Sequence, residues 1–417
     1  MQMKIDTLEF TNFKGIGNIK FELGGKSAVF FGVNGVGKSS ILRGINLLFS
    51  NVINKIVKHK FKQGINIELS DISADAEICS ICAGLVSADN FYVEYYRSME
   101  RKAKKRTHIQ RSLDALAGHF EEKYSDPNKN IPIFVNYGVN RLVLDVPLRI
   151  RTKHIFDREA AFEKAIENRI DFRTFFEWFR YQEDFENQQK VREKKNYEDV
   201  SLKAVRNAIA NMFDGFDNLR IERSPLSMKI NKDKTTLSIE QLSDGEKCTL
   251  ALIGDLARRL SLANPSRKNP LQGEGVALVD EIELHMHPAW QREILGKLKK
   301  TFPGIQFIIT THSPQVLGEV MEDFNIYSLN TDKGKICYSK INTLIGWDSN
   351  YILEDYMGAA SLNLKTKMLI NSMYDDYKNG DYKASKEKAS RLEEITNSLH
   401  EDVVKINFLL AKAELSA

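Results

Sequence analysis

A glycine-rich segment that ends in lysine and serine has the residue types of a phosphate-binding loop. Gly32 to Ser39, GVNGVGKS, fits the pattern GxxxxGK[ST] and lies between an apolar strand pattern, SAVFF, and a helical pattern. Glycines let backbone N–H groups turn toward a phosphate, the lysine reaches its outer oxygens, and the hydroxyl binds magnesium. The segment predicts an ATP and Mg²⁺ site. Its expected nucleotide contacts are Asn34, Gly35, Gly37, Lys38, Ser39 and Ser40, with Ser39 as a metal ligand and Lys38 also catalytic.

Two carboxylates follow a second apolar strand pattern, Val276 to Val279. Asp280 is expected to hold the magnesium shell. Glu281 is one residue further on, so it points elsewhere and can orient or deprotonate the attacking water. The pair therefore predicts hydrolysis of the bound nucleotide, with Asp280 as a metal ligand and Glu281 as the catalytic base.

Two further segments have chemistry that suits a phosphate. His312 follows the apolar strand FIIT, and its imidazole could touch a γ-phosphate. The segment Leu242 to Glu246, LSDGE, places a serine and a glycine at a predicted helix start, which offers N–H groups and a hydroxyl to an anion. We therefore expect His312 to be catalytic, and Ser243, Gly245 and Glu246 to contact nucleotide.

The elements that must position these residues alternate along the chain. Period-two patterns predict strands around residues 8–10 and 19–23, with a turn between them. The segment INIEL, at residues 65–69, also has a strand pattern. In the second half, helix patterns at 244–260 and after Pro288 alternate with strand patterns, which favours an α/β fold with a mostly parallel central sheet.

Helical periodicity replaces this alternation in two regions. Residues 155–214 include phenylalanines at i, i+3, i+4 and i+7, with Asp171 able to cap the helix start. The chain from Lys365 predicts two or three amphipathic helices, with a turn at 379–381. We expect three parts, namely a head formed by 1–150 and 215–345, an inserted helical lobe at 151–214, and a C-terminal helical region at 346–417.

Composition limits the class of protein. The 417 residues carry 60 Lys+Arg against 56 Asp+Glu, so bulk charge does not bind the chain to polyanions. There is no apolar run of 18 residues and no signal peptide, so we expect a cytoplasmic protein with no membrane contact. Four cysteines cannot form a disulfide framework, and Cys79 and Cys82 are expected to pack in the core rather than bind zinc.

A basic run at residues 101–106, RKAKKR, leaves two interpretations open. It is either the solvated tip of a hairpin or a patch that contacts nucleic-acid phosphates.

The order of these motifs resembles the ABC/SMC/RecF group of ATPases over residues 1 to 345, with LSDGE similar to the ABC signature. The opening EFTNFKGI resembles the N-terminal strand and turn of such heads, which implies that Lys14 lies near the nucleotide. The resemblance also implies a homodimer or higher homo-oligomer through the ATP sites. Ser243 and Gly245 of one copy would close on the γ-phosphate that the other copy holds.

The segment Asp280 to Pro288, DEIELHMHP, resembles the corresponding segment of the OLD-like ATPases. Taken alone, His285 and His287 could be metal ligands, whereas the resemblance puts them at the dimer seam beside the nucleotide. The resemblance also makes Asn136 to Arg141 the counterpart of the ABC Q-loop, although the glutamine is absent. It leaves open which residue there senses magnesium.

The middle of the chain, FVNYGVNRLVLDVPLRIRTKHIFD and DFRTFFEWFRYQEDFEN, resembles the PtuA ATPases of Septu-type anti-phage modules, some of which travel with retrons. Such a module implies a separate HNH nuclease partner, PtuB, and in retrons a reverse transcriptase and its nucleic acid. No Toprim or HNH pattern is evident, so we expect an ATPase without a nuclease site of its own. A RecF-like or SMC-like DNA-clamping head is the alternative, and a transporter subunit fits less well because its Q-loop glutamine is missing.

Overall fold

The computed structural model describes residues 3–57, 65–87, 91–108, 110–124, 126, 129–141, 156–192, 196–359, 362–396 and 400–416. These residues form two compact units, Met1–Ser349 and Asn350–Ala417. The predicted boundary between head and inserted lobe, at residue 150, lies outside the described residues.

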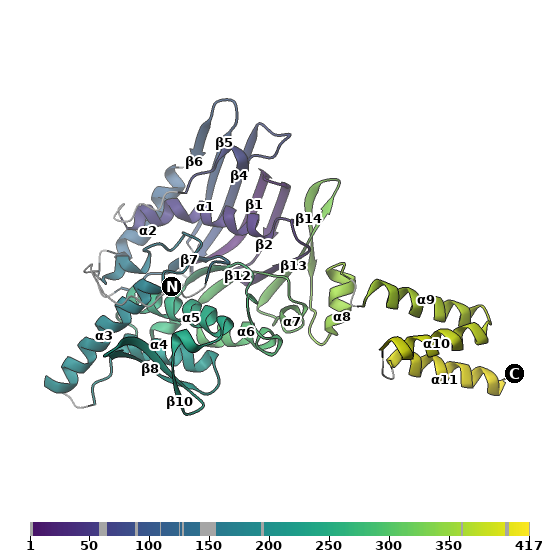
Figure 1. Cartoon of the computed structure of the whole chain (residues 1–417). Helices are drawn as coiled ribbons and strands as arrows, with labels where there is room; N and C mark the ends of the chain where they lie inside the picture. Colours follow the sequence, from purple (N-terminus) through teal and green to yellow (C-terminus); the bar gives the residue numbers. More distant parts are fainter. Residues whose placement is uncertain are drawn as a thin grey trace. The chain divides into compact units, whose positions relative to one another are not determined.

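Five parallel strands form the centre of the first unit (Figure 1). All residues of four of them are buried, which is usual for parallel strands covered on both faces. This explains why they are continuous apolar runs in the sequence. In sheet order the strands are β13 (Phe324–Asp332), β3 (Ser27–Phe31), β12 (Ile305–Thr311), β11 (Gly275–Val279) and β7 (Ile133–Tyr137).

Six more strands continue the same sheet beyond β13, to give eleven in all. Every pairing among them is antiparallel except the contact between β14 and β2. In sheet order they are β14 (Lys335–Ile341), β2 (Ile16–Glu22), β1 (Met3–Phe13), β4 (Ile78–Ser87), β5 (Tyr92–Glu100) and β6 (Lys105–His108). The predicted α/β class, with a mostly parallel core and an antiparallel N-terminal part, is confirmed.

Helix α1 (Lys38–Ile56) follows β3 after the loop at residues 32–37 and runs along the sheet, with α2 (Gln110–Tyr124) beside it (Figure 1). Their contact with the sheet is aromatic in part. The rings of Phe49 and Phe134 stack with centroids 4.3 Å apart, and Phe120 meets Phe134 edge-on. Burial of three such rings anchors α1, so its N-terminus is held at the end of β3.

A helical layer packs beside β7, and its largest side chains come from the predicted phenylalanine stripe. Phe175, Phe176 and Phe179 are fully buried, and the Asp171 carboxylate accepts a hydrogen bond from the Thr174 N–H at 3.2 Å, so both predictions are confirmed. A three-stranded antiparallel sheet joins this layer. The elements are α3 (Phe172–Arg192), α4 (Val200–Met212), β8 (Phe216–Arg223), β9 (Leu226–Lys232), β10 (Thr235–Ser238), α5 (Asp244–Ala263), α6 (Pro288–Thr301) and α7 (Pro314–Leu317).

The strand predicted at residues 65–69 is wrong. Residues 65–68 have no regular structure, and a 3₁₀ turn, Leu69–Asp71, follows. The Asp71 carboxylate accepts a hydrogen bond from the Glu68 N–H at 3.0 Å, and Ser50 and Arg97 donate to the Ile65 carbonyl. Side chains therefore provide hydrogen bonds to these backbone groups, and residues 65–68 do not pair with a neighbouring strand.

The second unit is a small helical bundle whose core includes Met373, Leu392 and Ile406. The predicted turn at 379–381 separates its first two long helices, and three such helices are present in the part that the structure describes. They are α9 (Leu364–Lys378), α10 (Tyr382–Thr396) and α11 (Glu401–Ser416), preceded by a short helical segment, α8 (Ser349–Tyr351), and a π-turn at Ile352–Tyr356. Among the described residues, no helix combines the length and apolarity that crossing a membrane requires.

Candidate functional site

The predicted catalytic residues gather at one edge of the sheet. Strands β3, β12, β11 and β7 are parallel neighbours, so their carboxyl ends meet there. The loop from Gly32 follows β3, Asp280 and Glu281 follow β11, and His312 follows β12. The fold therefore brings together residues that are up to 280 positions apart in the sequence.

The glycines of the loop after β3 are required by backbone geometry. Gly35 and Gly37 have φ angles of +83° and +88°, which side chains disfavour. A Cβ on Gly32 would lie 2.4 Å from the Leu329 carbonyl oxygen, and one on Gly37 would lie 2.3 Å from Ile336 Cδ1. The loop is thus packed against β13 and β14, and its tip, including Asn34, stays exposed.

Lys38 is the first residue of α1 and is buried, with 6% of its surface exposed. Its ammonium donates hydrogen bonds of 2.9 Å to the carbonyls of Gly32 and Val33, so the charge is held inside the loop. Burial lowers the pKa of Lys38, and the nearby carboxylates of Glu281, Asp280 and Glu283 oppose this shift. A cation in this position could neutralise a phosphate.

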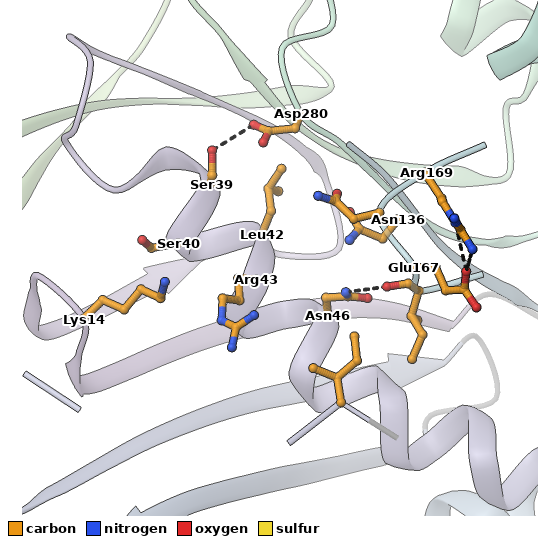
Figure 2. A pocket seen from close by; sticks show the side chains of 13 residues that line it. Lys14, Ser39, Ser40, Leu42, Arg43, Asn46, Asn136, Glu167, Arg169 and Asp280 are labelled. Carbon is orange, nitrogen blue, oxygen red and sulfur yellow. Dashed lines mark hydrogen bonds and ion pairs between the residues drawn. The ribbon is translucent and has the colours of Figure 1, made fainter. Parts of the chain in front are cut away.

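Asp280 lies where a magnesium ion bound by Ser39 would need a second ligand. The Ser39 hydroxyl donates to the Asp280 carboxylate over 3.3 Å (Figure 2). The Thr310 hydroxyl donates to the same oxygen over 2.5 Å. Thr310 also accepts a hydrogen bond from the Glu281 N–H, at 2.9 Å. Glu281 has a φ angle of +47°, a conformation that costs energy in a non-glycine residue. One hydroxyl therefore orients both carboxylate-bearing residues.

His312 is tied to the same loop through Glu283. The Glu283 carboxylate accepts hydrogen bonds from the His312 N–H at 2.6 Å and from the Thr311 hydroxyl at 2.8 Å. Burial lowers the pKa of the His312 imidazole, and the charge of Lys38 lowers it further, against the opposing effect of the carboxylates. The neutral imidazole, which donates from one ring nitrogen and accepts at the other, is therefore favoured over a wider pH range.

Arg141, just beyond β7, supports the backbone of the two carboxylates. Its guanidinium donates hydrogen bonds to the carbonyls of Asp280 and Glu281, at 2.9 and 2.5 Å, and only 2% of its surface is exposed. Burial lowers the pKa of Arg141, and the Cys248 thiol and the carboxylates of Glu283, Asp280 and Glu281 oppose this shift. The chain thus places a buried cation beneath its carboxylate cluster.

A cavity of about 730 Å³ opens beside Ser39 and Asp280 (Figure 2). A volume of this size is typical of small-molecule sites. The Asn136 side chain lines it, is 5% exposed, and carries a carboxamide oxygen that has no hydrogen-bond partner within the described structure. Such an oxygen could join Ser39 and Asp280 around a magnesium ion. The donor set and the volume both fit ATP and Mg²⁺.

Lys14 reaches the same cavity from the turn between β1 and β2. The Asp71 carboxylate pairs with both Lys14 and Arg43. The Asp71 carboxylate accepts two hydrogen bonds of 2.9 Å from Arg43 and lies 3.7 Å from the Lys14 ammonium. Burial works to raise the pKa of Asp71, but the hydrogen bonds from Arg43 and from the Glu68 backbone, with both nearby cations, lower it below its ordinary value. Two cations and one anion leave this wall positive, which suits a phosphate.

The signature segment, Leu242–Glu246, does not line the cavity. Ser243 caps α5 and is exposed, and its hydroxyl and N–H both donate to the Glu246 carboxylate at 2.8 Å. Lys232 on β9 pairs with that carboxylate at 2.6 Å. Burial works to raise the pKa of Glu246, but the bonds from Lys232 and Ser243 hold it below its ordinary value. Of the residues predicted to contact nucleotide or metal or to act in catalysis, the cavity is lined by Lys14, Ser39, Ser40 and Asp280, and its lining includes neither the signature residues nor Asn34, Gly35, Gly37, Lys38, Glu281 and His312.

Neither histidine of the loop after β11 has neighbours that make a metal site. The His287 imidazole caps α6 by accepting a hydrogen bond from the Ala289 N–H, at 3.3 Å, and His285 is exposed. No cluster of three or more His, Cys, Asp or Glu side chains that could hold a metal occurs among the described residues. Cys79 and Cys82 lie three apart on β4, so they point to opposite faces and cannot share an ion.

The basic run forms the turn between β5 and β6. Three of its five cations have partners, since Arg101 donates to carbonyls of residues 72, 73 and 76, Arg106 donates to the Ile67 carbonyl, and the Lys102 ammonium lies 3.5 Å from the Glu77 carboxylate. Lys102, Lys104 and Lys105 are exposed. The hairpin tip is therefore confirmed, while its contact with nucleic acid stays a prediction.

Sequence comparison relates this chain to proteins of bacterial retrons. It is 30% identical to the retron Ec83 probable ATPase of Escherichia coli, over 91% of this chain and 80% of that protein. The chain belongs to the retron ATPase family. A second family member, the retron Vc95 probable ATPase of Vibrio cholerae, is 29% identical over 77% of this chain and 73% of its own length. The chain is therefore an ATPase, as its motifs predicted.

More distant relatives of this chain extend the relationship. The Septu protein PtuA of Bacillus thuringiensis is 24% identical over 85% of this chain and 84% of its own, which confirms the predicted resemblance. Residues 146–318 match the family described as AAA domain, putative AbiEii toxin, Type IV TA system. The Smc head domain of Pyrococcus yayanosii, solved with a coiled coil and joint, shares the fold with a TM-score of 0.50 at 13% identity, over 85% of this chain and 99% of that one.

Sequence reasoning missed three residues that organise this site in the retron ATPase, namely Thr310, Glu283 and Arg141. Thr310 and Glu283 lie inside quoted motifs, but their partners are about 30 residues away. The partners of Arg141 are about 140 residues away. Two clues were available, since Glu283 is an acid two residues beyond Glu281 and Arg141 ends the segment expected to replace the Q-loop.

Proposed function

We propose that this chain binds ATP and Mg²⁺ at the carboxyl edge of its parallel sheet and hydrolyses the nucleotide there. The contact between Ser39 and Asp280, at 3.3 Å, carries the proposal, because a hydroxyl and a carboxylate on neighbouring elements are the ligands magnesium takes beside a phosphate-binding loop. In this arrangement Lys38 neutralises the phosphates, Glu281 activates water, and His312 contacts the γ-phosphate. Asn136 takes the place of the missing Q-loop glutamine.

The second part of the proposal is that ATP joins two heads. Ser243 is exposed at the start of α5, where its hydroxyl donates to the Glu246 carboxylate, so a phosphate held by a second copy would take the place of that carboxylate. Glu246 and Lys232 fix the serine through a capping box and an ion pair. Each ATP would then be gripped by Lys38 of one copy and sealed by Ser243 of the other.

Glu281→Gln tests both parts. The amide cannot act as a base while the phosphate contacts remain, so ATP should stay bound and the dimer should accumulate. Size-exclusion chromatography with light scattering should show a monomer without nucleotide and a dimer with ATP and Mg²⁺. A variant that hydrolyses ATP normally, or that stays monomeric with ATP bound, would contradict the proposal.

The relatives named for retrons and for Septu support a role in anti-phage defence. In this role the ATP-dependent dimer controls a separate nuclease of the HNH type, and in a retron it also meets a reverse transcriptase and its nucleic acid. Genes beside this one provide the first test. Neighbours that encode neither a nuclease nor a reverse transcriptase would count against the proposal, and copurification of a neighbouring nuclease with the ATPase would support it.

A further inference from the structure

One buried carboxylate holds two cations at the wall of the cavity. Asp71 is 1% exposed, whereas 34% of the Arg43 side chain and 36% of the Lys14 side chain are exposed. Arg43 lies on α1 and Lys14 lies between β1 and β2, and both line the cavity. A single carboxylate cannot neutralise two cations, so this wall keeps a net positive charge.

The guanidinium of Arg43 binds Asp71 along only one of its edges. Its Nε and Nη2 each donate a hydrogen bond of 2.9 Å to the carboxylate. A guanidinium has five N–H donors in one plane, so the other three point away from that carboxylate. Two of them, on Nη1 and Nη2, form the fork that binds phosphate oxygens in parallel. The contact with Asp71 therefore fixes Arg43 and leaves a phosphate-binding edge.

Lys14 is tied to the same segment through its backbone. Its N–H donates to the Asp71 carbonyl at 2.7 Å, and its carbonyl accepts a hydrogen bond from the Ser73 hydroxyl at 2.5 Å. The φ angle of Lys14 is +54°, which costs energy in a non-glycine residue and is found mostly at functional sites. The residues around Asp71 thus hold the turn between β1 and β2 with Lys14 at the cavity.

Helix geometry places Arg43 one turn beyond the magnesium-binding serine. Arg43 follows Ser39 by four residues, so their Cβ atoms are about 5–6 Å apart on one face of α1. The γ-phosphate must lie near the catalytic base, on the side of Asp280. Figure 2 shows Arg43 and Lys14 away from Asp280, beyond Ser39. Because magnesium bridges the β- and γ-phosphates, the α-phosphate is the group that extends toward Arg43.

Two carboxylates also line the cavity, and neither cancels the charge of this wall. Asp280 would face the magnesium ion, and Glu167 forms an ion pair of 2.8 Å with Arg169. The positive charge of Arg43 and Lys14 is therefore the charge that a phosphate beyond Ser39 meets.

We propose that Arg43 binds the α-phosphate of ATP and that Asp71 is the positioning residue that holds Arg43 and Lys14 in their binding orientation. The inference rests on the proposed function, since it requires the nucleotide to bind beside Ser39. It adds a cation to that of the glycine loop. It also gives the ion pairs of Asp71 a role beyond that of a clamp between α1 and the turn that carries Lys14.

Calorimetric binding of the full chain, with Mg²⁺, tests the role of Arg43 with ADP, β,γ-imido-ATP and inorganic tripolyphosphate. Arg43→Gln should weaken binding of all three about tenfold, because each loses a hydrogen bond between charged groups. The matched control is Lys55→Gln, which removes a cation from the same helix outside the cavity lining. It should change none of the three affinities.

Asp71→Asn separates positioning from a purely structural role. The amide has no charge to orient two cations, so ADP should bind several-fold more weakly. The same change should matter much less in Arg43→Gln, because residues that act through one another are not additive. A structural clamp would lower the melting temperature and leave the ADP affinity of the folded protein unchanged. Equal weakening in both backgrounds would contradict a role through Arg43.

Three results with Arg43→Gln would overturn the inference. They are unchanged affinities, a loss confined to β,γ-imido-ATP, which would place Arg43 at the γ-phosphate, or a loss for both nucleotides but not for tripolyphosphate, which would place it at the ribose or base. Each leaves the proposed ATPase site standing. Failure of the unaltered chain to bind any of the three ligands would instead contradict the proposed function.

Discussion

The backbone at Gly245 lies directly against the His285 carbonyl. A Cβ added to Gly245 would be 2.2 Å from that oxygen, so the first turn of α5 and the loop after β11 touch without room for a methyl group. The glycine of the signature segment thus has a role inside its own chain. It lets the segment that we propose to meet a partner's ATP rest on the loop that carries Glu281.

Gly245→Ala should therefore push α5 away from the loop after β11. We expect the melting temperature to fall and ATP turnover to be lost, while ATP still binds, because the cavity beside Ser39 is lined by other residues. Thermal unfolding and calorimetric ATP binding check this. Gly296→Ala on α6 is the control, since no atom lies within 4 Å of its added methyl group. Equal behaviour of the two variants would contradict the close contact.

Arg141 should act on catalysis rather than on nucleotide affinity. Its bonds to the Asp280 and Glu281 carbonyls fix the backbone of the base, so Arg141→Lys, which keeps the charge but not the forked geometry, should lower kcat on the order of 10²-fold with little change in KM. Steady-state kinetics separate the two effects. Arg223→Gln, on the distant β8, should change neither. A rise in KM at constant kcat would show that Arg141 serves binding instead.

A buried charge cluster joins α5 to β7 and should govern acid stability. Asp255 is buried between Arg258 and Arg259 and accepts a hydrogen bond from the Tyr137 hydroxyl, at 2.9 Å. Burial works to raise its pKa, but the charges of Arg259 and Arg258 lower the pKa from 3.8 to about 2. Because the pKa falls on folding, the stabilisation is complete above about pH 4 and is lost as pH falls toward 2.

Asp255→Asn should lower the free energy of unfolding at pH 7 by about 3–5 kcal/mol, since two buried guanidinium groups lose their counter-ion. The difference in free energy of unfolding between Asp255→Asn and the unaltered protein should narrow between pH 4 and pH 2. Urea unfolding at several pH values measures both effects. The exposed pair of Lys203 and Glu198 supplies the control, and Glu198→Gln should leave the free energy of unfolding almost unchanged. A gap that does not depend on pH would exclude titration of Asp255 as its origin.

The hairpin tip offers a test of the DNA-clamping alternative. Only Lys102, Lys104 and Lys105 should be replaced by serine, because Arg101 and Arg106 bind the backbone of residues 67–76. If the tip contacts duplex DNA, the triple variant should bind more weakly, and the slope of log K against log salt should fall by about 0.9 for each lost phosphate contact. Fluorescence anisotropy at several salt concentrations measures this. Unchanged affinity and slope would remove the argument for DNA contact through the tip.

The catalytic and phosphate-binding residues at the strand ends could be predicted from the sequence, because each motif is a short continuous segment. A glycine loop, a strand that ends in two acids and a capped helix start can each be recognised within ten residues, and parallel strands bring such ends together. The supports of these residues are not local. Nothing near Arg141 indicates that it will lie beneath Glu281, and Asp255 with Arg258 and Arg259 has the spacing of a solvated helix face. Their burial depends on how α5 meets β7, which periodicity does not reveal.

Mixing two inactive variants tests the shared ATP site most directly. Lys38→Ala damages the loop that grips ATP, and Ser243→Arg blocks the helix that seals the partner's ATP. Combined, they should rebuild one intact site per mixed dimer, so ATPase activity should return toward a quarter of normal for random pairing with independent sites. Lys38→Ala mixed with Glu281→Gln is the control and should stay inactive. Both residues belong to the half of the site that grips ATP, so each site of a mixed dimer contains one of the two changes. Recovery in the first mixture alone is the predicted result, and no recovery in either would contradict a site built from two copies.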